Sequence, residues 1–115
     1  MTIQDVLNEV DELKPNMYKT GTKIGWINVL DKKVYNDIIS REGYEGPEPE
    51  YSDLSDMETE LLVPDAYGDL YTYYIMSLME FNDGEIERYM NSSQMFNVKY
   101  NEFIGWYYYT HKQKR

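Results

Sequence analysis

The chain has 115 residues, of which 42% are hydrophobic and 28% are charged, a composition typical of one globular domain with a buried core. It carries 11 Lys and Arg against 21 Asp and Glu. The resulting net charge of −10 argues against binding to nucleic-acid phosphates or anionic lipid, since both require clustered cations. The absence of cysteine excludes disulfides and thiolate chemistry.

Two helices are predicted in the first third of the chain. Thr2 can cap the first helix, with Asp5 three residues later in a capping-box arrangement, and Pro15 ends it. Its apolar residues recur at helical spacing: Ile3, Val6, Leu7, Val10 and Leu13. The second helix is predicted from Thr22 to Arg41. Its buried stripe consists of Ile24, Ile27, Leu30, Val34 and Ile38, with Trp26 beside it.

The helical period fails from Glu42 to Val63, where two glycines and two prolines exclude a regular helix. The segment opens a 46-residue stretch, Glu42 to Glu87, that contains fourteen Asp and Glu and no Lys or Arg. A loop of about twenty residues is uncommon inside a compact domain and tends to be functional or disordered. We therefore expect a mobile acidic loop that carries the function, with Glu60 to Val63 compatible with a brief extended segment.

A third helix is predicted to open at Pro64 and Asp65 and to end at the tight break Asn82-Asp83-Gly84. Its apolar face consists of Tyr67, Leu70, Tyr71, Tyr74, Ile75, Leu78 and Met79.

The fourth helix, from about Glu85 to Thr110, is the most periodic segment and should pack antiparallel to the third. Its stripe consists of Ile86, Tyr89, Ser93, Phe96, Tyr100, Phe103 and Tyr107. No single stripe can bury three consecutive tyrosines, so at least one ring among residues 107–109 must face outward. The fold class is therefore all-α, a small bundle of about four helices in one domain, residues 1–115. A long acidic loop, residues 42–63, joins helices two and three, and a basic tail covers residues 111–115.

Motifs for catalysis or metal binding are scarce in this sequence. No nucleophile elbow, phosphate-binding loop, dinucleotide fingerprint or zinc-protease motif occurs, and the one histidine, His111, sits in the tail with no orienting partner. The loop carboxylates lack the order of an EF-hand. We expect no enzyme activity, no cofactor and no metal. Neither a secretion leader nor an apolar run of membrane-spanning length is visible.

The separation of acidic from basic residues says more about function than these motifs do. The acidic centre and the basic tail are complementary, and if they cannot meet within one molecule they can meet between neighbours in a head-to-tail contact. From charge alone, two merely solubilising regions are equally compatible with the sequence. The candidate interaction residues are Tyr44, Glu48, Glu50, Tyr51, Asp53, Asp56, Glu58, Tyr108, Tyr109, Lys112, Lys114 and Arg115.

Four local segments look familiar: residues 5–10, residues 23–28, residues 60–67 (Glu-Leu-Leu-Val-Pro-Asp-Ala-Tyr) and residues 96–103 (Phe-Asn-Val-Lys-Tyr-Asn-Glu-Phe). With the order of elements, they make the chain resemble the small helical head–tail connector proteins (head-completion or adaptor proteins) of long-tailed bacteriophages. The resemblance covers essentially the whole chain. It rests on helices and turns rather than on an invariant signature.

The resemblance implies a virion structural protein, made in the bacterial host cytoplasm. Many copies would form a ring beneath the portal, with residues 42–63 as a protruding loop. The C-terminal helix and tail would contact adjacent portal, head or tail proteins, and the isolated chain would be a monomer or dimer. No enzymatic residues, membrane contact or sequence-specific nucleic-acid binding are implied.

Two other functions stay open from the residues themselves. Fourteen uncompensated carboxylates could imitate nucleic-acid phosphates in an acidic inhibitor of a host DNA-binding protein, provided that they lie on a rigid surface. A small hydrolase with paired carboxylates would need a closed pocket, for which the periodic helices leave no obvious insertion except the loop.

Overall fold

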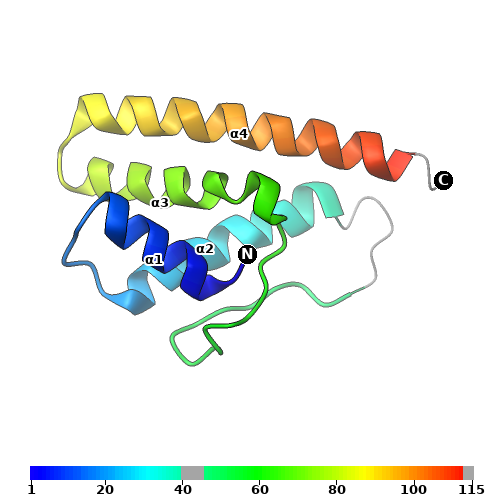
Figure 1. Cartoon of the computed structure of the whole chain (residues 1–115), viewed down its shortest axis with the longest axis horizontal. Coiled ribbons are helices and arrows are strands. Elements are labelled where there is room, and N and C mark those ends of the chain that lie inside the picture. The colour runs from blue at the N-terminus through cyan, green and yellow to red at the C-terminus, as the bar shows by residue number, and fades with distance from the viewer. Residues whose placement is uncertain (40–45, 113–115) are drawn as a thin grey trace.

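The computed structural model describes residues 1–39 and 46–112, and it confirms a small all-α fold (Figure 1). The helices are α1 (Ile3–Leu13), α2 (Thr20–Val34), α3 (Asp69–Asn82) and α4 (Ile86–Lys112), with a π-helical turn η1 (Tyr35–Ile39) and a 3-10 turn η3 (Asp65–Tyr67). Among these described residues the only β pairing is an isolated antiparallel bridge between Thr2 and Glu60.

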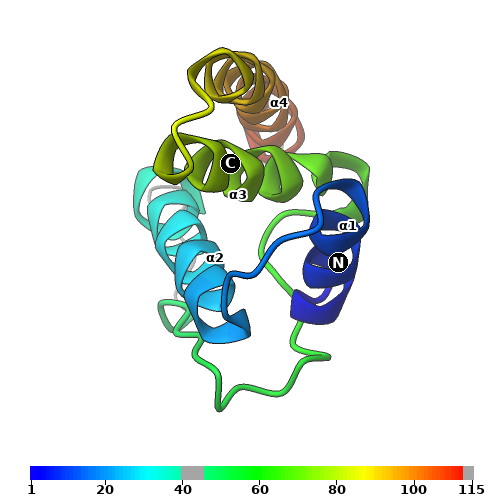
Figure 2. The ribbon, with the colours of Figure 1, turned by 90° about the vertical axis from the view of Figure 1, so that its left-hand side faces the viewer.

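The helices form three layers with α3 in the middle. Figure 2 shows α4 along one side of α3 and the pair α1 and α2 on its other side, with the irregular residues 46–64 on the far side of that pair. α4 runs antiparallel to α3 through the turn at Gly84, whose φ of 76° suits glycine (Figure 1). The predicted antiparallel pairing and the break at residues 82–84 are both confirmed.

The start of α1 is fixed by its own side chains. The Asp5 N–H donates to Thr2 Oγ1 at 3.1 Å, and the Thr2 N–H donates to Asp5 Oδ2 at 3.0 Å, so the expected capping box is present. The predicted apolar stripe of α1 is buried except at its last position. Leu13 is 61% exposed, because the helix ends there and the chain turns away towards α2.

The second helix starts earlier and ends differently than the sequence predicts. It begins at Thr20, and after Val34 the chain continues through the π-helical η1 instead of an α-helix to Arg41; residues 40 and 41 lie outside the described part. The Asn36 side-chain amide donates to the Lys32 carbonyl at 2.8 Å, the oxygen that the Asn36 N–H would bond in an α-helix. The predicted stripe of five apolar residues is buried throughout.

The core lies between α3 and the other helices. α3 contributes its fully buried residues Leu70, Tyr71, Ile75 and Met79, and α4 contributes Tyr100, Phe103 and Tyr107. The predicted stripe of α4 is wrong at two positions, Ile86 and Ser93. Ile86 is 54% exposed because the turn at Gly84 leaves the first residue of α4 outside the contact with α3, and Ser92 is more deeply buried than Ser93.

The described part of the acidic segment, residues 46–64, is irregular but attached to the helices. The N–H groups of Ile3 and Gln4, which no helical carbonyl can accept, donate to the carbonyls of Thr59 and Met57 at 3.1 and 2.9 Å. Tyr51, Leu61 and Val63 are buried in the core. Tyr51 is therefore a core residue of the segment, and its ring lies between the loop and α2.

Candidate functional site

A buried carboxylate holds the acidic segment to the helices. Asp31 of α2 is 0% exposed, and three donors reach it: Tyr51 Oη at 2.7 Å, Tyr71 Oη at 2.5 Å and the Leu62 N–H at 3.1 Å. Tyr71 Oη in turn accepts the Val63 N–H at 3.0 Å. Residues from α2, α3 and both halves of the loop therefore converge on one carboxylate.

Burial sets the titration of this network. It raises the pKa of Asp31 above its ordinary value, against the lowering effect of the hydrogen bonds from Tyr71, Tyr51 and Leu62. Burial and the nearby Asp31 charge raise the pKa of both tyrosines. No described Lys or Arg lies within ion-pair distance of Asp31. Because all three side chains are buried, the network holds the loop in place, and only Tyr51 borders an open depression, beside Gly21 and Asp53.

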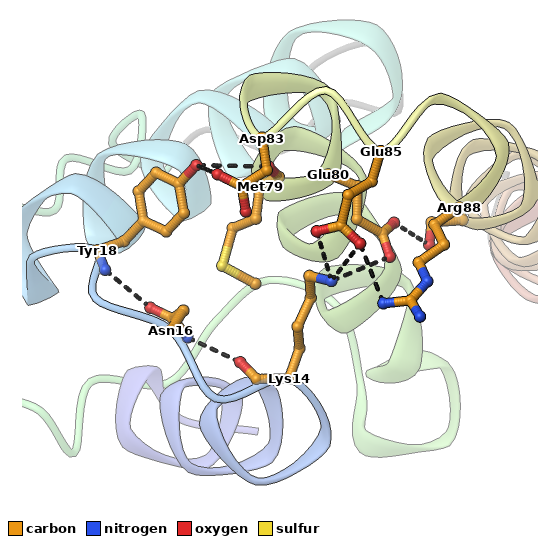
Figure 3. A network of polar contacts seen from close by, with 9 residues as sticks. Lys14, Asn16, Tyr18, Met79, Glu80, Asp83, Glu85 and Arg88 are labelled. Carbon is orange, nitrogen blue, oxygen red and sulfur yellow. Dashed lines mark hydrogen bonds and ion pairs between the residues drawn. The ribbon is translucent and has the colours of Figure 1, made fainter.

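A second polar network joins the α3–α4 turn to the connection between α1 and α2 (Figure 3). Lys14 Nζ lies 3.1 Å from Glu85 Oε1 and 3.7 Å from the buried Glu80, and Ser92 Oγ donates to Glu80 Oε1 at 2.6 Å. Tyr18 Oη donates to Asp83 Oδ1 at 2.6 Å. An open depression of about 380 Å³ lies beside these residues. Sequence reasoning missed both networks. Each depends on a buried carboxylate, Asp31 in α2 and Glu80 in α3, and in the sequence both look like ordinary surface charges.

The structure separates the predicted loop residues into paired and unpaired ones. Glu48 and Glu50 lie against Lys32 of α2, at 3.8 and 2.6 Å, and the Lys32 hydrogen bond lowers the pKa of Glu50. Tyr51 is 8% exposed and bonds to Asp31, and Tyr44 lies outside the described residues.

The tip of the loop is the exposed part. Asp53, Asp56 and Glu58 are exposed, and within the described part of the chain none of them forms an ion pair. Leu54 is 92% exposed. Hydrogen bonds within the loop fix this tip: the Ser55 N–H donates to the Ser52 carbonyl at 3.0 Å. The tip therefore presents three carboxylates and one leucine on a defined turn.

Three of the C-terminal candidates, Tyr108, Tyr109 and Lys112, lie on α4. Tyr107 is buried, whereas Tyr108 is 40% and Tyr109 71% exposed, so the prediction that at least one ring faces outward is confirmed. His111 stacks on the Tyr107 ring at 3.8 Å and its Nδ1 lies 2.9 Å from the Tyr107 carbonyl. Lys112 is the last residue of α4, and Lys114 and Arg115 lie outside the described part.

The loop tip and the end of α4 are not brought together. Both views place the loop on the far side of α1 and α2 and α4 on the far side of α3 (Figures 1 and 2). The acidic tip is therefore not neutralised by α4 of its own chain.

The outer face of α4 is a further exposed surface that sequence reasoning did not single out. Between Arg88 and His111 the helix carries only two charged residues, Lys99 and Glu102. Its exposed residues in that interval are Met90, Asn91, Gln94, Met95, Asn97, Val98, Asn101, Glu102, Gly105, Tyr108 and Tyr109. Few charges together with exposed Met and Tyr are typical of the core of a protein interface. The signal was present in the sequence as a charge-poor face opposite the aromatic stripe.

No group of three or more His, Asp or Glu that could hold a metal ion occurs within residues 1–39 and 46–112. Within the same ranges, no helix has the length and apolarity needed to span a bilayer. Comparison of the chain with family models, curated proteins and solved structures finds no significant match.

Proposed function

We propose that the chain is a structural subunit of the head–tail connector of a long-tailed bacteriophage, in which copies assemble beneath the portal. The observation that carries the proposal is that two exposed surfaces lie on opposite sides of one small helical body. One is the acidic loop tip and the other is the charge-poor outer face of α4. A subunit of a ring or stack needs two such separate contact surfaces.

Electrostatics supports different roles for the two surfaces. At a net charge of −10, copies of this chain repel each other, so a contact between them should avoid the carboxylates. The outer face of α4 supplies Met90, Val98 and Tyr109 with Glu102 as its one carboxylate between residues 90 and 110. The loop tip, with Asp53, Asp56 and Glu58, instead suits a basic surface on the portal or on the next protein in the stack.

The test is co-sedimentation of the purified chain with the portal ring encoded in the same genome. We expect the chain to sediment with the ring, and the triple variant Asp53→Asn, Asp56→Asn, Glu58→Gln to bind about tenfold more weakly. The control variant replaces two exposed acids elsewhere, Glu12→Gln on α1 and Glu87→Gln on α4, and should bind as the parent chain does. A chain that stays monomeric in the presence of the portal ring would count against the proposal.

A second function, an acidic inhibitor that imitates nucleic acid, is favoured by one observation. The loop tip is fixed by hydrogen bonds, such as the Glu58 N–H to Asp56 Oδ1 at 2.9 Å, so its carboxylates have defined positions. Capture of a host DNA-binding protein that duplex DNA displaces would favour this inhibitor over the connector. Capture of the portal that DNA does not displace would favour the connector.

A further inference from the structure

The outer face of α4, opposite α3, has a regular spacing of its own. Steps of four and three residues alternate along it, and every position up to residue 108 is exposed. The exposed Met90, Met95 and Tyr109 flank this row. Such spacing keeps one line of side chains facing a neighbouring helix over many turns. We call this line the outer row; it consists of Glu87, Asn91, Gln94, Val98, Asn101, Gly105, Tyr108 and Lys112.

Gly105 stands in the outer row although its own chain does not need a glycine there. Glycine inside a helix weakens the helix relative to most other residues. A Cβ at Gly105 would meet no atom within 4 Å, so no described part of the chain requires the small residue. A missing side chain lets a neighbouring helix approach closely. The glycine therefore points to a contact outside the single chain.

The distribution of charge favours a second copy of this chain as the partner. α4 carries a net charge of +1, with Arg88, Lys99 and Lys112 against Glu87 and Glu102, whereas the whole chain carries −10. Two copies that meet through α4 therefore keep most of their acids apart, which reduces their mutual repulsion. The acidic loop tips lie on the opposite side of each body and point away from this contact (Figure 2).

The outer row is complementary to itself when two helices run antiparallel. Glu87 lies in the first turn of α4, exposed and without an ion pair in the described part of the chain, and Lys112 is the last residue of the helix. A parallel pair would place like charges together at both ends, whereas an antiparallel pair also opposes the two helix dipoles favourably. With Glu87 opposite Lys112 of the second copy, every other member of the row meets another member: Asn91 with Tyr108, Gln94 with Gly105, and Val98 with Asn101.

We propose that two copies of this chain pair through the outer row of α4, antiparallel, about a two-fold axis between residues 98 and 101. Both copies use the same surface, so the contact closes at two copies, over about 40 Å of helix. The pair carries its two acidic loop tips at opposite ends, where both are open to a basic partner. The inference rests on the proposed function, which assigns the outer face of α4 to a contact between copies, and adds the orientation, the register and the number of copies.

Analytical ultracentrifugation of the full chain over a concentration series tests the number of copies. We expect monomers and dimers and no larger species. Gly105→Glu places a carboxylate inside the contact and should weaken dimerisation at least about tenfold. Its unfolding midpoint should stay unchanged or rise, because the replaced glycine is helical and faces open space. Gly25→Glu, the same replacement on α2 where a Cβ also meets nothing within 4 Å, should dimerise as the parent chain does.

Disulfide cross-linking tests the orientation and the register, since the chain contains no cysteine of its own. A mixture of Asn91→Cys and Tyr108→Cys should form cross-linked dimers under mild oxidation, because the two positions face each other in the pair. Each variant alone should cross-link no faster than Asp53→Cys at the loop tip. Its two thiols would lie about 25 Å apart along the antiparallel helices, which is too far for a disulfide.

Three results would overturn the proposal: a monomer at every soluble concentration, species larger than a dimer, or unchanged dimerisation in Gly105→Glu. Rapid cross-linking of Asn91→Cys with itself would also overturn it, by indicating parallel helices. Both experiments use the chain alone. Their failure is therefore distinct from a failure to bind the portal ring.

Discussion

The acidic segment, residues 46–64, and the C-terminal half of α4 differ in how their backbones are held. The segment has almost no regular structure, yet Asp31, Asn28 and the first turn of α1 all bond to it, and it contributes Tyr51, Leu61 and Val63 to the core. The end of α4 is fully helical, yet it runs past the start of α3 (Figure 1). There Tyr67 of η3 contacts Phe103 and Trp106, at ring-centroid distances of 6.0 and 5.5 Å.

The comparison teaches that regular backbone and tertiary attachment are separate properties. A helix satisfies its own hydrogen bonds and can extend away from the core, so its outer face is available to another protein. An irregular segment must find partners elsewhere, and here those partners are buried side chains and helix ends. The tip of the segment, residues 52–58, remains open to a partner and forms no ion pair within the described part of the chain.

The largest effect should come from Asp31→Ala, which breaks the attachment of the loop. The replacement leaves Tyr51 Oη, Tyr71 Oη and the Leu62 N–H without an acceptor, and we expect the free energy of unfolding to fall by about 3 kcal/mol. Urea unfolding measures the loss. Asp53→Ala, at the exposed tip, should stay within about 0.5 kcal/mol of the parent chain. A loss below 1 kcal/mol for Asp31→Ala would show that the other contacts of the loop hold it without Asp31.

A smaller effect is expected from Lys14→Ala in the second network. The change removes the cation that faces Glu80, whose carboxylate is buried and keeps only the Ser92 hydroxyl as a partner. We expect a loss of about 2 kcal/mol in the free energy of unfolding. Lys19→Ala, which removes the same charge from an exposed position, serves as the control. Equal stability of the two variants would mean that Glu80 needs no cation.

The pH dependence of stability sharpens the contrast between buried and exposed acids. The folded pKa of Asp31 lies above the 3.8 of an ordinary aspartate, so the folded chain keeps a proton that the unfolded chain releases. Its contribution to stability is full below pH about 4 and is lost as the pH rises through the folded pKa. Relative to Asp31→Asn, which does not titrate, the parent chain should therefore lose stability as pH rises from 4.

Asp11→Asn is the matched control with the opposite sign. Partial burial opposes the shift, but hydrogen bonds from Lys23 and Asn16 lower the pKa of Asp11. Its contribution is present above the ordinary pKa and is lost as the pH falls through the folded one. Urea titrations at several pH values compare the two variants. If both variants show the same pH slope relative to the parent chain, the folded pKa of Asp31 does not lie above its ordinary value.

The smallest effect on folding is expected from Tyr109→Ser on the outer face of α4. Tyr109 is 71% exposed, and serine has a similar helix propensity, so the free energy of unfolding should change by less than about 0.5 kcal/mol. Tyr107→Ser, two residues earlier but buried, should lose about 3 kcal/mol. Light scattering over a concentration series should show weaker self-association for Tyr109→Ser. Unchanged association would remove Tyr109 from the contact surface.

Sequence by itself determined the helices and their order, because capping residues, glycines, prolines and a 3.6-residue apolar period act over a few neighbouring positions. The capping box at Thr2, the break at Gly84 and the buried stripe of α2 all followed from such local signals. The exposed ring among residues 107–109 followed from geometry alone, since one helix face cannot bury three consecutive side chains.

Only the tertiary structure decided which charged residues are buried and where the irregular segment lies. Asp31 and Glu80 become core residues because hydroxyls, an N–H and a lysine from distant parts of the chain meet them, and no local pattern encodes those partners. Local sequence fixes backbone hydrogen bonds within an element, whereas the burial of a polar group depends on the simultaneous placement of several elements.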